Sequence, residues 1–224
     1  MSFNNEIPDI AEYVNIKDYT PLLKQLYALV HDDTRHNTFG KTPFVSYSLE
    51  DSKTGEPNGY EQIFDPILHE HRQVHPDYQF RSTGFNTANS IEKDVFPHTD
   101  VDYDTEYTGN YNLVIPIHGA SRIDYFETRE EEVYLPEKNA HGFAYYHEFK
   151  AQSEMGQGTP EFETFLADRK IGHIIVDRPL LLNTNIMHRV VITQAPRSSF
   201  VTRWNNIPPI DFHSFKKRVE QILQ

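Results

Sequence analysis

Apolar and polar residues follow two kinds of pattern along the chain. The first appears at residues 18–31 (DYTPLLKQLYALVH), where apolar residues recur at the spacing of a helix. Asp18 or Thr20 is suited to cap this helix, and Pro21 suits its first turn. The pattern therefore predicts an amphipathic helix whose apolar stripe comprises Leu22, Leu23, Leu26, Leu29 and Val30.

Three further segments share this helical pattern. One spans about 60–73, another runs from Thr159-Pro160 to about 169, and the last occupies residues 211–224 with Asp211 as its cap. The apolar residues of the last helix are Phe212, Phe215, Val219, Ile222 and Leu223.

The second pattern consists of short runs rich in β-branched and aromatic residues, separated by turn residues. It predicts strands at 43–49, 78–85, 111–119, 122–127, 132–135, 143–149, 172–177, 188–193 and 198–204. Because strands and helices do not alternate, a doubly wound α/β sheet is not expected. We predict a mainly β fold with flanking α-helices, in one domain over residues 1–224 with a jelly-roll or barrel core.

Composition and charge narrow the functional classes. Residues of hydrophobic type make up 38% of the chain, enough for a substantial core, while the net charge of −12 disfavours a nucleic-acid groove. The chain has no cysteine, which excludes disulfides and thiolate chemistry. No signal peptide or apolar run long enough to span a membrane is apparent. We expect a soluble, cytoplasmic protein, and its oligomeric state is not predicted.

Acidic residues crowd around one histidine in DVFPHTDVDYD (residues 94–104). An EF-hand loop counted from Asp100 would need glycine and glutamate where Thr105 and Tyr111 stand, so this motif is excluded. A looser calcium site stays open, as does a solvated acidic loop. No role is assigned to Asp94, Asp102 and Asp104.

The pair His98-x-Asp100 suggests a different metal site. In an extended chain, residues two apart point to the same side and can bind one ion. Similar pairs at His31/Asp33 and His75/Asp77 lie at a predicted helix end and in a turn, whereas His98 lies just before a strand-rich block. The alternative interpretation of the pair is a turn in which the aspartate binds backbone N–H groups.

More candidate residues follow in the segment 181–203. His188 opens an apolar strand, and Arg197 and Ser199 face one side if the following segment is extended. A guanidinium and a hydroxyl together suit a carboxylate. Arg203 lies on the same strand face and is a rival candidate, and a surface ion pair is the alternative role for Arg197.

The order His-x-Asp, distant His and Arg-x-Ser resembles the Fe(II)- and 2-oxoglutarate-dependent dioxygenases over about residues 78–204. The resemblance implies a double-stranded β-helix fold, Fe(II) held by His98, Asp100 and His188, and 2-oxoglutarate as co-substrate bound through Arg197 and Ser199. It also implies dioxygen as a reactant and hydroxylation of an unidentified substrate as the reaction. Asn112, on the next strand, is a candidate for the keto-acid end of the co-substrate.

Several alternatives stay open at this point. His71 and His75 have the spacing of two zinc ligands on a helix, but the glutamate of a metalloprotease motif is absent, which favours a polar helix face. The chain could also be a non-catalytic jelly-roll module, or a cupin-like metal enzyme that does not use 2-oxoglutarate. Six tyrosines either line a substrate pocket or form an aromatic β surface: Tyr103, Tyr107, Tyr111, Tyr125, Tyr145 and Tyr146.

Overall fold

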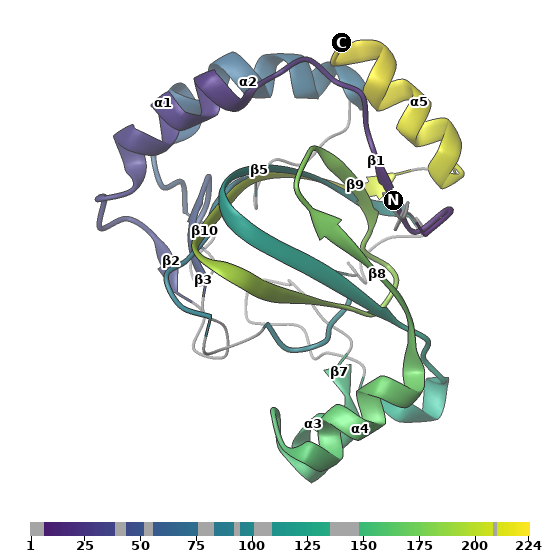
Figure 1. Cartoon of the computed structure of the whole chain (residues 1–224). Coiled ribbons are helices and arrows are strands. Elements are labelled where there is room, and N and C mark those ends of the chain that lie inside the picture. The colour runs from purple at the N-terminus through teal and green to yellow at the C-terminus, as the bar shows by residue number, and fades with distance from the viewer. Residues whose placement is uncertain are drawn as a thin grey trace.

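The computed structural model describes residues 7–38, 44–51, 56–75, 83–91, 95–100, 109–134, 148–207 and 210–224. An eight-stranded antiparallel sheet dominates them, in the order β1-β9-β5-β10-β4-β3-β2, with β8 paired to β5 (Figure 1). Its strands are β1 (Ala11–Tyr13), β2 (Asn37–Thr38), β3 (Phe44–Ser48), β4 (Gly84–Ala88), β5 (Gly109–Phe126), β8 (Lys170–Val176), β9 (Leu180–Asn183) and β10 (His188–Ile207).

Two long strands, β5 and β10, form the centre of the sheet and pair from His188 opposite Tyr125 to Ile207 opposite Gly109. The sequence predicts each of them as two strands, and this is wrong. Gly119 adopts a left-handed φ of 67°, and a Cβ there would lie 2.3 Å from the Pro196 carbonyl oxygen. The residues between the predicted strands, at 120–121 and 194–197, therefore do not end the strands. They lie where the pairing of β5 with β10 is irregular and shifts in register.

Side chains on these two strands alternate between two faces. Phe200 and Trp204 belong to the core beneath the helices, and Thr202 Oγ1 lies 2.7 Å from Nδ1 of His71 in helix α2. Val201 belongs instead to a second core cluster that includes Tyr125. We call this second side the inner face. By the same alternation it carries Asn112, Arg197, Ser199 and Arg203.

Helices α1 (Thr20–Val30), α2 (Glu61–Val74) and α5 (Phe212–Ile222) cover one face of the sheet (Figure 1). The predicted cap of α5 is confirmed, since the Asp211 carboxylate accepts from the Ser214 N–H at 2.8 Å. The predicted cap of α1 is wrong: its N-cap is Tyr19, which makes no side-chain capping bond, and Asp18 before it accepts from the Thr20 N–H at 2.9 Å. Leu29 is 67% exposed, so its predicted place in the apolar stripe is wrong. The buried contacts of α1 come from Leu23, Leu26 and Val30.

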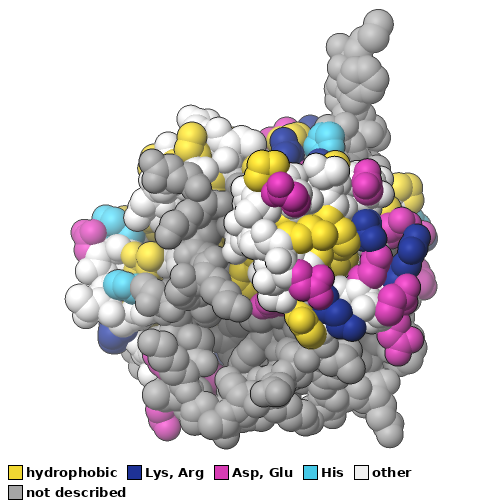
Figure 2. Space-filling model, turned by 90° about the horizontal axis from the view of Figure 1, so that it is seen from below, with side chains coloured by type: hydrophobic (Ala, Val, Ile, Leu, Met, Phe, Trp, Pro, Cys, Tyr) yellow, Lys and Arg dark blue, Asp and Glu magenta, His cyan; other side chains and the backbone are white. Residues whose placement is uncertain are grey.

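At the opposite end of the molecule lie α3 (Lys150–Met155), α4 (Pro160–Arg169), the short helix η1 (Glu130–Glu132) and the strand pair β6 (Val133–Tyr134) and β7 (Glu148–Phe149). Figure 2 shows this end, where Lys and Arg side chains lie next to Asp and Glu side chains around a group of hydrophobic ones. The predicted start of α4 at Thr159-Pro160 is confirmed, and Thr159 caps the helix, because its Oγ1 accepts from the Phe162 N–H at 3.3 Å.

A buried ion network ties this end to the sheet. Asp124 of β5 is fully buried, and its two carboxylate oxygens accept from Arg122, Lys170 and Arg189. Arg189 also binds Glu163 of α4 at 2.8 Å. We call these five residues the Asp124 network. Burial opposes ionisation of Asp124, but the hydrogen bonds from Lys170 and Arg122 hold the pKa of its carboxyl below the usual value.

The sequence analysis misses several short elements: β1, β2, β9 and α3 are not predicted. Strand β4 begins at Gly84, near the end of the predicted strand 78–85, most of which lies outside the described residues. In the part of the chain described here, no helix has both the length and the apolar composition needed to cross a membrane.

Candidate metal centre

The segment 95–100 lies along the start of β10, and this pairing brings the candidate ligands together. His98 and His188 exchange two backbone hydrogen bonds of 2.9 Å, and the Asp100 N–H donates to the Thr184 carbonyl at 2.9 Å. All three side chains are buried. The Asp100 side chain contacts His98, Asn112 and Arg203. It therefore does not form the alternative turn in which the aspartate binds backbone N–H groups.

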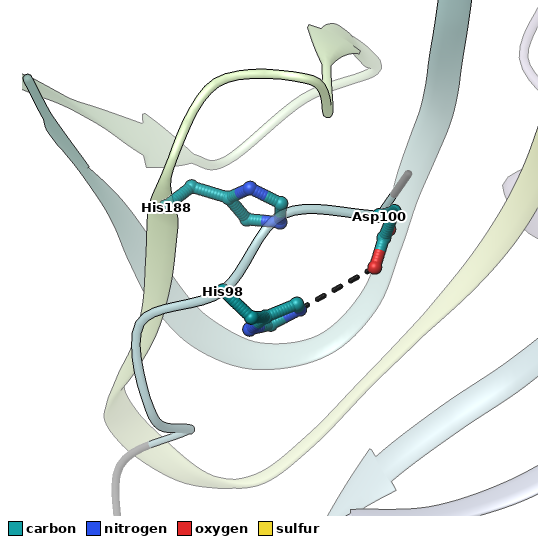
Figure 3. A group of neighbouring side chains, drawn as sticks. All are labelled: His98, Asp100 and His188. Carbon is teal, nitrogen blue, oxygen red and sulfur yellow. Dashed lines mark ion pairs between the residues drawn. The ribbon is translucent and has the colours of Figure 1, made fainter. Parts of the chain in front are cut away.

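Each histidine is oriented by a backbone carbonyl. His98 Nδ1 lies 2.8 Å from the Phe96 carbonyl oxygen, and His188 Nδ1 lies 2.9 Å from that of Ile186. These hydrogen bonds assign the proton of each ring to Nδ1 and leave the Nε2 lone pair for another partner. One ligand atom from each of His98, Asp100 and His188 lies within 4.8 Å of the others (Figure 3).

The two oxygens of Asp100 have different surroundings. Oδ2 accepts a hydrogen bond from Asn112 Nδ2 at 3.0 Å and lies 3.0 Å from Arg203 Nη1. Oδ1 lies 3.5 Å from His98 Nε2 and has no hydrogen-bond partner among the residues that the structure describes. Burial opposes ionisation, but Arg203 and then the two histidines hold the pKa of the Asp100 carboxyl well below its usual range.

The chemistry of this group fits a divalent transition metal. Burial, followed by the neighbouring His98, lowers the pKa of His188 to about 4, so its imidazole is neutral at neutral pH, as coordination requires. Two imidazoles and one carboxylate form the facial triad that leaves open positions on non-haem iron. The orphaned Oδ1 of Asp100 is the atom that such an ion would satisfy.

Strand β10 bends strongly between the two ends of this site. His188 opens the strand and Arg203 lies near its end, yet both side chains lie at Asp100. A straight strand rises about 3.3 Å per residue and would keep them far apart. Figure 1 shows the curvature of β10. Arg197 and Ser199 lie between these two residues in the strand and on its inner face.

Arg197 is a buried cation without an acidic partner in the described residues. It is 5% exposed, its Nε donates to Ser121 Oγ at 3.2 Å, and its guanidinium lies 5.4 Å from the centre of the Phe44 ring. Burial lowers its pKa to about 10, so it stays charged at neutral pH. Ser199 is fully buried, and its hydroxyl has no hydrogen-bond partner within the described ranges.

Tyr125 adds another unsatisfied polar group on the inner face. It pairs with His188 across β5 and β10, its ring lies 6.0 Å from that of His188, and its buried hydroxyl has no hydrogen-bond partner in the described part of the chain. Burial and the charge of Asp100 raise the pKa of its phenol. Tyr111 behaves differently, because it packs against Phe212 and Phe215 under α5, so it does not line the site.

Other sequence predictions are resolved less favourably. The predicted polar helix face at His71 is wrong, because His71 is fully buried. His71 and His75 do not form a candidate zinc site either, since the only group of potential metal ligands in the described residues is the one at His98. Ser121 and the contact of Arg203 with Asp100 were not predicted, although alternation along 121–125 already places Ser121 and Tyr125 on one face. Outside the described residues lie Asp77, Asp94, Asp102, Asp104, Tyr103, Tyr107, Tyr145 and Tyr146.

Comparison with known proteins supports the fold. No protein-family model matches the chain, and no curated protein is similar to it in sequence. Among solved structures, HygX from Streptomyces hygroscopicus, determined with nickel and 2-oxoglutarate bound, matches with a TM-score of 0.52 and 11% identity. The match covers 89% of this chain and 83% of HygX. The predicted mainly β, jelly-roll fold with flanking helices is thereby confirmed.

Proposed function

We propose that the chain is an Fe(II)- and 2-oxoglutarate-dependent dioxygenase that hydroxylates a small molecule or a protein side chain. The observation that carries the proposal is the convergence of His98, Asp100 and His188 around an orphaned Asp100 oxygen. The likeness of fold to HygX, which binds nickel and 2-oxoglutarate, agrees with it.

His98, Asp100 and His188 would hold the metal through two Nε2 atoms and Oδ1. Iron with 2-oxoglutarate and dioxygen supplies the oxidising chemistry that inserts oxygen into a C–H bond. The chain's own residues orient the ligands: the Phe96 and Ile186 carbonyls fix the imidazoles. Asn112 and Arg203 fix the carboxylate. Asn112 thus supports the metal ligand through Nδ2, and its buried Oδ1 has no partner in the described residues.

Arg197, with Ser199, is assigned to the distal carboxylate of 2-oxoglutarate. A buried guanidinium without a carboxylate is costly, and an anionic ligand would compensate it with charge-assisted hydrogen bonds. Arg203 is the weaker candidate for this role, since its guanidinium already contacts Asp100. Nothing in a purely structural jelly-roll module, or in a cupin-like enzyme without 2-oxoglutarate, requires this cation on the inner face.

Anaerobic titration with Fe(II) and 2-oxoglutarate tests the proposal. The chelate of iron and the keto acid has a weak visible charge-transfer band, and we expect it to appear with wild type. His188→Ala should lack the band because it lacks a metal ligand. Arg178→Ala, an exposed arginine paired only with Asp177 and Tyr13, serves as the control and should keep it. Metal binding without any such band would favour the cupin-like enzyme, and no metal binding would favour the binding module.

We propose one domain over residues 1–224 and a cytoplasmic location. Dioxygen and an unidentified primary substrate would be the other reactants, and the excess of acidic residues makes a nucleic-acid substrate unfavourable.

A further inference from the structure

Two donors of different charge hold the same oxygen of Asp100. Asn112 on β5 and Arg203 on β10 are direct cross-strand partners, and both approach Oδ2 at 3.0 Å. The amide is neutral and the guanidinium is positive. Both residues orient the carboxylate, but only Arg203 also changes the charge around it.

The positive charge of Arg203 increases the negative charge that a bound divalent ion requires from other ligands. Asp100 is the one carboxylate in the group of potential ligands within the described residues, and imidazoles bind metals as neutral groups. Because the guanidinium cancels the charge of the carboxylate, the side chains of the described residues at this site leave both positive charges of a divalent ion uncompensated. In a buried site this excess is unfavourable until an anion enters the open coordination positions.

We propose that Arg203 couples metal binding to the binding of an anionic chelator, so that the metal is held firmly only when the co-substrate is present. The inference rests on the proposed function in taking 2-oxoglutarate as that anion. Asn112 orients the same carboxylate without contributing to this coupling, because the amide carries no charge.

The coupling is measured by binding Mn²⁺ to the metal-free, full-length chain with and without 2-oxoglutarate, following the resonance of free Mn²⁺. The ratio of the two dissociation constants is the coupling, and any direct effect of a substitution on metal binding cancels from it. Arg203→Met should lower this ratio about tenfold relative to wild type. Arg203→Lys keeps the charge and should retain most of the coupling.

Asn112→Leu is the matched control. It removes the neutral donor from the same oxygen, so it should weaken Mn²⁺ binding about tenfold to hundredfold while leaving the ratio unchanged. A repeat with oxalate, a smaller dianion that chelates metals, removes any contribution from a distal carboxylate clamp. Arg203→Met should reduce the coupling with oxalate as it does with 2-oxoglutarate.

Each outcome bears on a different claim. If wild type shows coupling that Arg203→Met retains, or that Asn112→Leu reduces equally, the inference is wrong and the proposed function is unaffected. If wild type shows coupling with oxalate alone, the proposed use of 2-oxoglutarate is wrong although Arg203 acts as described. Arg203→Gln replaces Arg203→Met in all comparisons if thermal melting shows that the methionine variant does not fold.

Discussion

The molecule contains two buried aspartates that are equipped in opposite ways. Asp124, between the sheet and α4, has both oxygens hydrogen-bonded to cationic side chains. Asp100, on the inner face, has one oxygen bound by Asn112 and Arg203 and the other without a hydrogen bond. Both carboxyl groups have lowered pKa values, so the direction of that shift does not distinguish them.

The difference in hydrogen bonding indicates different roles for the two carboxylates. A carboxylate whose oxygens are all paired stabilises the fold, and the unpaired oxygen of Asp100 stays available to a ligand. The arginines repeat the contrast: Arg189 binds Asp124 and Glu163, whereas Arg197 has only the Ser121 hydroxyl and the Phe44 ring. Substitutions in the two regions should accordingly affect different measurements.

Asp124→Ala should give the largest loss of stability. It leaves Arg189 and its neighbours without their shared carboxylate, and breaking a buried ion pair costs about 3–5 kcal/mol. Urea unfolding of the metal-free protein measures the change in the free energy of unfolding. Asp65→Ala, on the exposed side of α2, is the control and should stay within about 0.5 kcal/mol of wild type. A loss equally small for Asp124→Ala would contradict a structural role for the network.

Asp100→Ala should remove metal binding and lower stability less than Asp124→Ala, because in the described residues Asp100 pairs with one arginine and Asp124 with three cationic side chains. It deletes one of the three proposed ligands, so the loss in Mn²⁺ affinity should exceed the about tenfold to hundredfold cost of changing a residue that only orients a ligand. Equilibrium dialysis measures this affinity, with Asp124→Ala compared under conditions where it is folded. Unchanged affinity in Asp100→Ala would mean that the three side chains do not hold a metal.

The sequence predicts the members of this site better than their roles. His98-x-Asp100, His188 and Arg197 are visible as motifs because metal ligation and carboxylate binding need particular residue types at short spacings. The curvature of β10 is not visible, since it arises from pairing with β5 across the irregular stretch near Gly119. Without that curvature, Arg203 cannot be placed beside Asp100.

Burial is the other limit of the sequence patterns. The polar segment around His71 predicts an exposed helix face, but packing against Tyr19 and Trp204 buries the ring completely. Strand β9 (LLLN) carries no alternation because both of its faces are covered, so periodicity gives no strand signal there. Leu29 shows the converse, an apolar residue in register with the stripe that the tertiary structure leaves exposed.

Arg197 tests the second half of the comparison. Arg197→Ala should raise the 2-oxoglutarate concentration needed for binding about tenfold to hundredfold, since charge-assisted hydrogen bonds contribute roughly 1.5–3 kcal/mol. Arg197→Lys keeps the charge but not the planar fork and should give a smaller rise. Mn²⁺ affinity without 2-oxoglutarate should be nearly unchanged in both, and stability should not fall as it does in Asp124→Ala. If Arg203→Ala abolishes 2-oxoglutarate binding and Arg197→Ala does not, the clamp is Arg203.

The smallest expected effect concerns His71, which also has an unpartnered ring atom but no converging ligands. Its Nε2 is buried without a partner, while Nδ1 lies 2.7 Å from Thr202 Oγ1. Burial lowers its pKa to about 3, against about 6.5 in the unfolded chain. Between these values the unfolded chain binds more protons than the folded one, so stability falls as the pH falls from about 6.5 toward 3.

This contribution amounts to at most about 1.4 kcal/mol per pH unit and should disappear in His71→Gln. Urea unfolding of the metal-free protein at several pH values between 4 and 7 measures the slope, and the variant should show a shallower one than wild type. Because His188 is also buried with a pKa of about 4, some slope should remain in the variant. His69→Gln, on the exposed side of the same helix, is the matched control and should keep the wild-type slope. If the free energy of unfolding depended on pH equally in His71→Gln and in wild type, His71 would be accessible to protons in the folded state. Its buried Nε2 would then be as available to a ligand as the Nε2 atoms of His98 and His188.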